Sequence, residues 1–269
     1  MEISHLQQTP GIMKFDDLDA RMRVFEMAQD YQVLPEIFMV ARIDGRGFTK
    51  LTKEVHKFEA PYDERFRDLM VDAACHLMNC GFRVVYAYTQ SDEISLLFHK
   101  EADAFGRKIR KYNSILASEA SAAFTLKLGS IGTFDCRISQ LPTEKLVIDY
   151  FRWRQEDASR NALNSHCYWL LRKQGKTVRQ ATDFLSGQST SGKNELLFSN
   201  GINFNKIPAW QKRGIGVYWE VVSKEGYNPV SRQATQTTRR QLKVDLQLPM
   251  KNAYTDFLQN MIAEAARQL

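Results

Sequence analysis

The order of strand-like and helix-like segments in the first half of the chain limits the possible folds more than any single motif does. Two segments with apolar residues at helical spacing, around 66–78 and 107–127, separate short apolar runs that are typical of strands. These runs lie at 37–43, 83–90, 94–99 and 133–141. Strand, helix, strand, strand, helix, strand is the order of the split βαβ, or ferredoxin-like, fold. We therefore expect an α+β protein built on an antiparallel sheet.

The second half of the chain is predicted to be mainly helical. Thr143 is a suitable N-cap for one long helix, or two, that continue to Lys173. The aromatic residues of this region are expected in the core rather than as platforms for stacking bases. Further helices are expected ending near 185–187, opening at 191–195 and over 255–269, with one strand at 214–222. We divide the chain into a domain at 1–142, which includes a helix around 15–32, and a mainly helical region at 143–269.

Carboxylates stand at the ends of two predicted strands. Asp44 follows the run at 37–43, and Asp92 and Glu93 separate the next two runs. Each motif alone also fits an ordinary turn or a solvated hairpin tip. Together in one sheet, carboxylates at two strand ends can hold hard divalent cations against a triphosphate. Polymerases of the palm type place metal ligands on the first strand and the central hairpin of this fold, so the pair predicts phosphoryl or nucleotidyl transfer.

The residues after Asp44 add a candidate phosphate contact. Backbone amides of the Gly45-Arg46-Gly47 segment can approach phosphate oxygens closely, and Arg46 adds positive charge. No Gly-Lys-Ser/Thr follows, so the segment is not a Walker A loop, and it is not a dinucleotide-binding fingerprint either.

The charge balance favours a polyanionic partner. The net charge is +6 and the pI is near 9.1. A solvated surface and contact with nucleic acid explain each of two basic clusters about equally well. The clusters are 107–111 (Arg107, Lys108, Arg110 and Lys111) and 232–243 (Arg232, Arg239, Arg240 and Lys243).

The other composition features bound the class of protein. The four cysteines show no close pairing typical of zinc sites, and no run of about twenty apolar residues or signal-peptide core is present. A cytoplasmic protein without a membrane partner is expected.

Five motifs in order resemble the tRNA(His) guanylyltransferase superfamily, whose members polymerise in the 3′ to 5′ direction. The motifs are Ala41-Arg-Ile-Asp-Gly-Arg-Gly-Phe48, Ala87-Tyr-Thr-Gln-Ser-Asp-Glu93, Trp153-Arg-Gln-Glu-Asp157, Gly192-Lys-Asn-Glu-Leu-Leu-Phe198 and Gly201-Ile-Asn-Phe-Asn205. The resemblance implies a polymerase-like palm in which a nucleoside triphosphate such as ATP or GTP activates the 5′-monophosphate of a tRNA. The 3′-hydroxyl of an incoming nucleotide then attacks that activated end.

The resemblance also implies roles for individual residues. Asp44 and Asp92 would hold two Mg²⁺ ions with the carbonyl of Gly45, and Glu93 would support them. The nucleotide contacts would come from Gly45, Arg46, Gly47, Phe48, Thr49, Ser91, Lys193 and Asn194. Similarity to the family further implies a homotetramer, and the region at 143–269 would complete the active site and contact tRNA.

Departures from the pattern of the eukaryotic enzymes favour one branch of the superfamily. Those enzymes carry His-Ile-Asn-Asn-Leu-Tyr-Asn where this chain has Ser159-Arg-Asn-Ala-Leu-Asn-Ser165, and Thr49 and Ala60 replace an expected histidine and lysine. These differences predict templated repair of 5′-truncated tRNA. The alternatives are guanosine addition to tRNA(His), a palm-type nucleotidyl cyclase and a non-catalytic RNA-binding palm protein.

Overall fold

A six-stranded antiparallel sheet forms the centre of the protein. The computed structural model describes residues 14–228 and 233–267, with the side chains of 225–236 outside the description. The strands lie in the order β4-β1-β3-β2-β5-β6. Their bounds are β1 Phe38–Arg46, β2 Val84–Gln90, β3 Glu93–Phe98, β4 Thr133–Leu141, β5 Ile215–Asn228 and β6 Gln233–Asp245.

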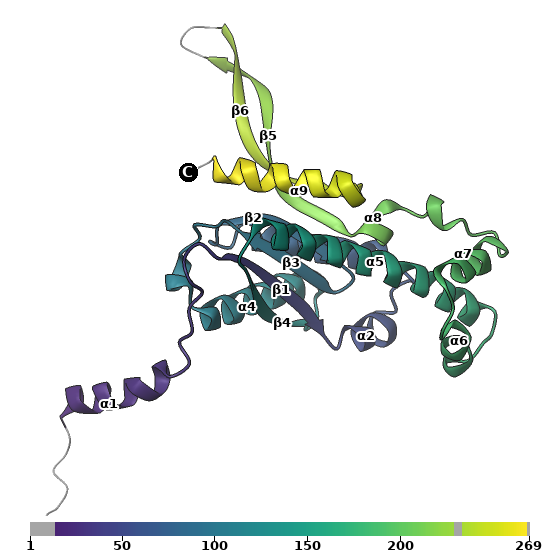
Figure 1. The fold of residues 1–269 in the computed structure, drawn as a ribbon, viewed down its shortest axis with the longest axis horizontal. Coiled ribbons are helices and arrows are strands. Elements are labelled where there is room, and N and C mark those ends of the chain that lie inside the picture. Colours follow the sequence, from purple (N-terminus) through teal and green to yellow (C-terminus); the bar gives the residue numbers. More distant parts are fainter. Residues whose placement is uncertain (1–13, 229–232, 268–269) are drawn as a thin grey trace, which may run out of the picture.

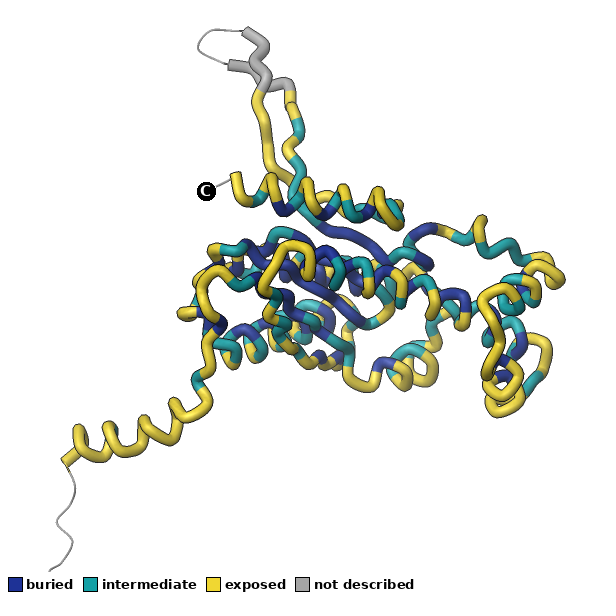
Figure 2. Tube along the Cα trace, in the orientation of Figure 1, coloured by how far each residue is buried: buried dark blue, intermediate teal, exposed yellow. Residues whose placement is uncertain are grey.

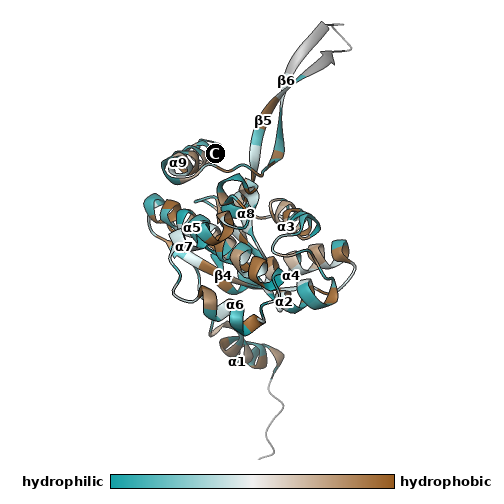
Figure 3. Cartoon of the chain, turned by 90° about the vertical axis from the view of Figure 1, so that its right-hand side faces the viewer, coloured by the Kyte–Doolittle hydropathy of each residue, from teal (hydrophilic) through white to brown (hydrophobic). Residues whose placement is uncertain are grey.

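Helices cover both faces of this sheet. Helices α3 (Glu64–Leu77) and α4 (Ile109–Leu128) pack on one face, and α5 (Glu144–Lys173) and α9 (Lys251–Ala266) pack on the other (Figures 1 and 3). Alternation along β1 sends Met39, Ala41 and Ile43 into the first layer, and Phe38 and Val40 into the second. The same alternation brings Arg42 and Asp44, further along β1, to the face covered by α5.

The first half of the chain confirms the predicted order of elements. Strands and helices lie within a few residues of their expected positions, and Thr143 caps α5 by accepting a hydrogen bond from the amide of Leu146. A short helix, α2 (Phe48–Lys50), and a π-helical turn (Leu51–Val55) follow β1. A 3₁₀ turn, Ala104–Arg107, precedes α4.

Three further helices pack around the C-terminal half of α5. They are α6 (Val178–Leu185), α7 (Thr190–Phe198) and α8 (Ala209–Arg213), with a 3₁₀ turn at Phe204–Lys206. Leu163, Cys167 and Leu171 of α5 share a small separate core with α6 and α7. We call α6, α7 and α8, with the segments that join them to α5 and to one another, the helical lobe. Figure 1 shows it beyond one end of the sheet.

The second half also contributes two strands, of which the sequence predicted only part of the first. Strands β5 and β6 pair along their whole length and extend as a ribbon beyond the helical layers (Figures 1 and 2). Strand β6 is rich in Gln, Thr, Arg and Lys, so it lacks the apolar alternation that marks a strand covered on one face. Arg232, counted in the basic cluster at 232–243, lies outside the described residues.

Helix α1 (Phe15–Met27) projects from the body with no buried residue (Figure 2). It is shorter than the predicted helix around 15–32. Among the described helices, none combines the length and apolar character needed to cross a membrane.

Candidate active site

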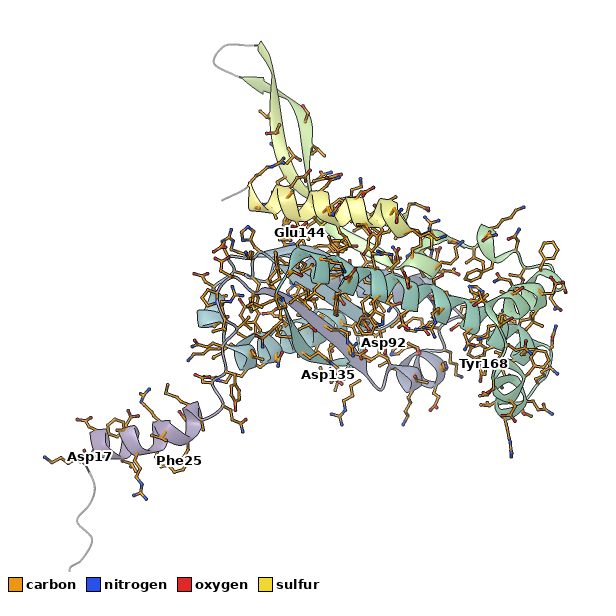
Figure 4. All side chains as sticks on the ribbon, in the orientation of Figure 1. Asp17, Phe25, Asp92, Asp135, Glu144 and Tyr168 are labelled. Atoms are coloured by element: carbon orange, nitrogen blue, oxygen red, sulfur yellow. The ribbon has the colours of Figure 1, made fainter. Side chains whose placement is uncertain are left out.

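The backbone of the sheet brings the two predicted carboxylates together. Asp44 on β1 lies opposite Glu93 on β3. The amide of Gly45 donates to the carbonyl oxygen of Asp92 at 2.9 Å, which ties the end of β1 to the turn between β2 and β3. Asp44 and Asp92 line one cleft of about 440 Å³, which is walled by the sheet end, the segment after β1, α5 and α8. Figure 4 shows Asp92 at this end of the sheet.

No basic side chain among the described residues is paired with Asp44 or Asp92. Burial raises the pKa of Asp92, the negative charge of Asp44 adds to that rise, and hydrogen bonds from its own amide and from the Ser91 hydroxyl oppose it. Two adjacent carboxylates without a cationic partner are therefore suited to bind a divalent cation.

The oxygen ligands that Asp44 and Asp92 offer suit Mg²⁺, which does not need a closed cage of protein ligands. Among the described residues, no group of three or more His, Cys, Asp and Glu side chains is arranged to hold a metal. Mg²⁺ is usually bound by one or two carboxylates together with substrate phosphates and water, so Asp44 and Asp92 suffice as its side-chain ligands.

Glu93 is engaged differently from its neighbours. Arg154 of α5 donates from Nε to Oε1 at 2.8 Å and from Nη2 to Oε2 at 2.7 Å, and both side chains are buried. Arg154 also reaches Asp157 at 3.2 Å, and Arg42 lies 4.0 Å from Glu93. Burial raises the pKa of Glu93, and the guanidinium of Arg154 opposes that rise. This pairing makes Glu93 a fixed support that joins β3 to α5.

Arg154 lies in the motif at 153–157, but the motif alone does not predict a role for it. A pattern in α5 indicates its burial: Val147, Phe151 and Ala158 face the core, and Arg154 falls on the same stripe. An arginine at a core-facing helical position needs a buried acidic partner, which Glu93 provides.

The segment after Asp44 has a conformation that requires its glycines. A Cβ atom on Gly45 would lie 2.6 Å from the Phe48 ring, and Gly47 has φ of 73°. The Phe48 side chain is buried among Phe66, Phe124 and Phe134 and so anchors the start of α2. Phe48, Thr49 and Ser91 line the cleft, and Gly45, Arg46 and Gly47 connect Asp44 to that lining.

Comparison with known proteins decides the family. The model of the tRNAHis guanylyltransferase family matches residues 19–142, and the model of the Thg1 C terminal domain matches 145–259. The chain belongs to the tRNA(His) guanylyltransferase family. Members of this family are nucleotidyltransferases, which confirms the enzyme class predicted from the carboxylates.

Individual relatives of the tRNA(His) guanylyltransferase family agree with this assignment. The chain is 38% identical to the probable tRNA(His) guanylyltransferase of Drosophila melanogaster, over 69% of this chain and 68% of that protein. It is also 38% identical to the tRNA(His) guanylyltransferase of Schizosaccharomyces pombe, over 71% and 78%. These relatives carry the name of the alternative activity, guanosine addition, so they support it better than templated repair.

Solved structures in the tRNA(His) guanylyltransferase family share the fold. A bacterial tRNA(His) guanylyltransferase (Thg1)-like protein in complex with ATP superposes with a TM-score of 0.70 at 25% identity, covering 91% of this chain and 99% of that one. The Saccharomyces cerevisiae tRNA(His) guanylyltransferase superposes with a TM-score of 0.67 at 28% identity, covering 72% and 91%.

Five predicted nucleotide contacts are not among the residues that line the cleft: Gly45, Arg46 and Gly47, which adjoin it, and Lys193 and Asn194, which lie elsewhere. Lys193 and Asn194 belong to α7 in the helical lobe. The backbone carbonyl of Lys193 accepts a hydrogen bond from the Cys167 thiol, and the side-chain amide of Asn194 donates one to the backbone carbonyl of Thr190. Neither side chain is among the residues that line the cleft.

The predicted RNA contact at Arg107 is wrong. Its guanidinium is buried and donates to the backbone carbonyls of Ile37, Lys100 and Ala102, so no face remains for a phosphate. Arg107 instead joins the loop before α4 to the start of β1.

The other predicted RNA contacts differ in their availability. Lys108 pairs with Asp30 at 2.5 Å, which offsets its charge, and Lys111 lies 5.8 Å from the Phe105 ring centroid. Arg239 and Arg240 are exposed on β6, with Arg240 stacked 5.1 Å from the Trp219 ring centroid. The two arginines of β6 therefore remain the best candidates from the predicted set.

Proposed function

We propose that this chain is a metal-dependent nucleotidyltransferase that adds guanosine to the 5′ end of tRNA(His). The observation that carries the proposal is the pair of carboxylates, Asp44 and Asp92, at adjacent strand ends in one cleft, with no basic side chain among the described residues paired to either. The names of the relatives and of the solved neighbours supply the substrate class.

In this proposal Asp44, Asp92 and the Gly45 carbonyl hold two Mg²⁺ ions, which supply charge neutralisation at the phosphates when bound. The amides around Gly47 and the hydroxyls of Thr49 and Ser91 hold the triphosphate. The RNA 5′-phosphate attacks the α-phosphorus of a nucleoside triphosphate and releases pyrophosphate. The 3′-hydroxyl of GTP then attacks the activated 5′-phosphate and releases the nucleoside monophosphate.

Templated repair of truncated tRNA is the second candidate, and one feature favours it. Asn164 and Ser165 line the cleft at positions where the eukaryotic pattern has tyrosine and asparagine. These two residues change the wall of the cleft, and a different wall can change which RNA 5′ ends the enzyme accepts.

The identity of the opposing nucleotide separates these two activities. Full-length tRNA(His) transcripts that differ only in having adenosine or cytidine opposite the added position are incubated with GTP, ATP and Mg²⁺. If the enzyme adds guanosine to tRNA(His) without a template, the rates of addition to the two transcripts should differ by about tenfold or less. The added nucleotide is then not selected by a base pair with the opposing nucleotide. A product seen only opposite cytidine would replace this proposal with templated repair, and the absence of any 5′-extended product would contradict both.

We also propose that Arg239 and Arg240 bind RNA phosphates. Changing both to glutamine should lower tRNA affinity and flatten the slope of log affinity against log salt by about 0.7 to 0.9 for each phosphate that the protein no longer neutralises. NTP affinity should not change, since neither arginine lines the cleft. Filter binding across a salt series measures the slope, and the exposed pair Lys127→Gln/Lys145→Gln is the matched control. An unchanged slope in the arginine variant would assign these residues to a solvated surface.

We further propose a homotetramer, supported by the uncovered apolar face of α1. Phe15, Leu18, Met22 and Phe25 are all exposed and recur at helical spacing. Leu18→Asp/Phe25→Asp should therefore reduce the mass measured by light scattering, whereas Ala20→Asp on another face of α1 should not. A wild-type mass of one chain would rule out the assembly.

A further inference from the structure

An aromatic wall with no assigned role lines part of the cleft that holds Asp44 and Asp92. It consists of Tyr62, which precedes α3, Trp169 of α5 and Trp210 of α8. The rings of Tyr62 and Trp210 meet edge to face at 5.7 Å, and Tyr62 lies 5.6 Å from the His166 ring. His166 in turn is hydrogen-bonded to Gln211 at 3.0 Å. These contacts hold the Trp210 end of the wall in place before any ligand binds.

The tryptophans of this wall differ from the aromatic residues of the core. Tyr112 and Phe124 are completely buried, whereas Trp169 and Trp210 are half-buried and border open space. One face of α5 continues the wall, since Asn161, Ser165 and Trp169 follow one another at intervals of four residues and all line the cleft. Half-exposed indoles beside amide and hydroxyl groups suit a flat ligand with polar edges, such as a nucleobase.

Each tryptophan also has a cation beside it. Arg67 lies 5.0 Å from the Trp210 ring centroid, and Lys53 lies 5.5 Å from that of Trp169. Lys53 is exposed, so a stacking base can displace it at little cost and leave its ammonium group close to the adjoining phosphate.

The segment of the chain that follows Trp169 and contains Trp210 carries an excess of positive charge. Residues 172–213, which run from the end of α5 through the helical lobe, carry eight lysines and arginines but only two carboxylates, Asp183 and Glu195. That excess equals the net charge of +6 of the whole chain. Lys173, Arg179 and Lys206 are exposed, although Arg179 is paired with Asp183, whereas Lys212 is buried and donates to two backbone carbonyls.

We infer that Trp169 and Trp210 stack an unpaired base at an RNA end, and that exposed cations of the helical lobe bind the phosphates next to it. The inference rests on the proposed function, because it takes the partner to be RNA. Lys173 and Lys206 are exposed and form no ion pair among the described residues, so they can bind the phosphates of a nucleic-acid chain. The phosphates of the free nucleotide are assigned to the segment after Asp44, so the wall remains for the RNA.

Two hairpin RNAs test this assignment without relying on turnover. One has a blunt end and the other has the same stem with a four-nucleotide single-stranded overhang, and both are radiolabelled at the 5′ phosphate for filter binding. The wild-type protein should bind the overhang RNA more tightly than the blunt RNA. Trp169→Leu and Trp210→Leu should each lower affinity for the overhang RNA about tenfold, and affinity for the blunt RNA less than about twofold.

Further variants separate stacking from a structural role. Trp169→Phe and Trp210→Phe keep an aromatic face and should retain most of the overhang preference, and Phe198→Leu, which alters an exposed ring of α7 outside the cleft lining, should leave it unchanged. Lys173→Gln/Lys206→Gln should lower affinity for both hairpins and reduce the salt slope. Thermal unfolding identifies any variant that has lost its fold. If a leucine variant is unfolded, the overhang preference of the corresponding phenylalanine variant is used to test the assignment.

Two results would overturn the assignment. One is an unchanged overhang preference in both folded leucine variants. The other is a loss of ATP or GTP affinity in the leucine variants while their RNA affinity is unchanged. That result would show that the wall binds the base of the free nucleotide. Binding of the overhang RNA through the wall without any nucleotide addition would instead contradict the proposed function and leave this inference standing.

Discussion

Replacing Asp44 or Asp92 by alanine is expected to lower the rate of nucleotide addition by at least about 1,000-fold. Each change removes a charged oxygen ligand whose contribution to transition-state stabilisation amounts to several kcal/mol, and each 1.4 kcal/mol corresponds to about a factor of ten. The measurement is single-turnover 5′ extension of a tRNA transcript with Mg²⁺ and GTP. Turnover within about tenfold of the wild type in either variant would contradict the metal assignment.

Asp135→Ala is the matched control for this pair. Asp135 lies opposite Asp44 on the neighbouring strand β4, but it is exposed and is not among the residues that line the cleft (Figure 4). Its removal should leave the rate within about twofold, since an exposed pair such as Asp135–Arg137 contributes little.

Thermal unfolding without divalent ions shows whether the carboxylate variants lose activity by unfolding. Burial and the charge of Asp44 raise the pKa of Asp92 above its unfolded value, so above that unfolded pKa the ionised form destabilises the fold. Asp92→Asn should therefore unfold at the same or a higher temperature at pH 7, while losing the stabilisation that Mg²⁺ gives the wild type.

The second large effect is expected at Arg154. Arg154→Met leaves the buried Glu93 without its bidentate partner, and breaking a buried ion pair from one side costs about 3 to 5 kcal/mol. That loss is a large part of the stability of a typical domain, about 5 to 15 kcal/mol. Urea unfolding at pH 7 should show it as a lower midpoint.

A double variant isolates the cause of this loss. Glu93→Gln/Arg154→Met removes both charges, so it should recover a substantial part of the stability that Arg154→Met alone removes. Arg179→Met, which breaks an exposed pair with Asp183, should have almost no effect. A double variant no more stable than the single one would show that Arg154 acts through packing.

The parts of this protein that follow local rules were predictable from its sequence. The short apolar run at 37–43 is typical of a buried strand. Antiparallel pairing with the run at 94–99 then places Asp44 near Asp92 and Glu93. Strand β6 was missed because most of its length lies beyond the helical layers, where no apolar face is needed.

The remaining errors concern side chains whose environment depends on distant segments. Arg107 lies in a basic run typical of a surface, but its buried guanidinium donates to the backbone carbonyls of Lys100 and Ala102 and to that of the distant Ile37. Trp169 was expected in the core, but the core of the helical lobe uses Cys167 and Leu171, and the indole borders the cleft. Neither environment can be read from a single periodic pattern.

Strand β6 also has a consequence for the behaviour of the protein in concentrated solution. It is the last strand of the sheet, so one row of its amide and carbonyl groups has no neighbouring strand within the described chain. Such an edge is a template for pairing with a second molecule, and charged side chains oppose that pairing by mutual repulsion. Arg239, Arg240 and Lys243 place three positive charges along this edge strand. Removing them should therefore favour precipitation through strand addition, and a polyanion that neutralises them would also have to cover the edge that they protect.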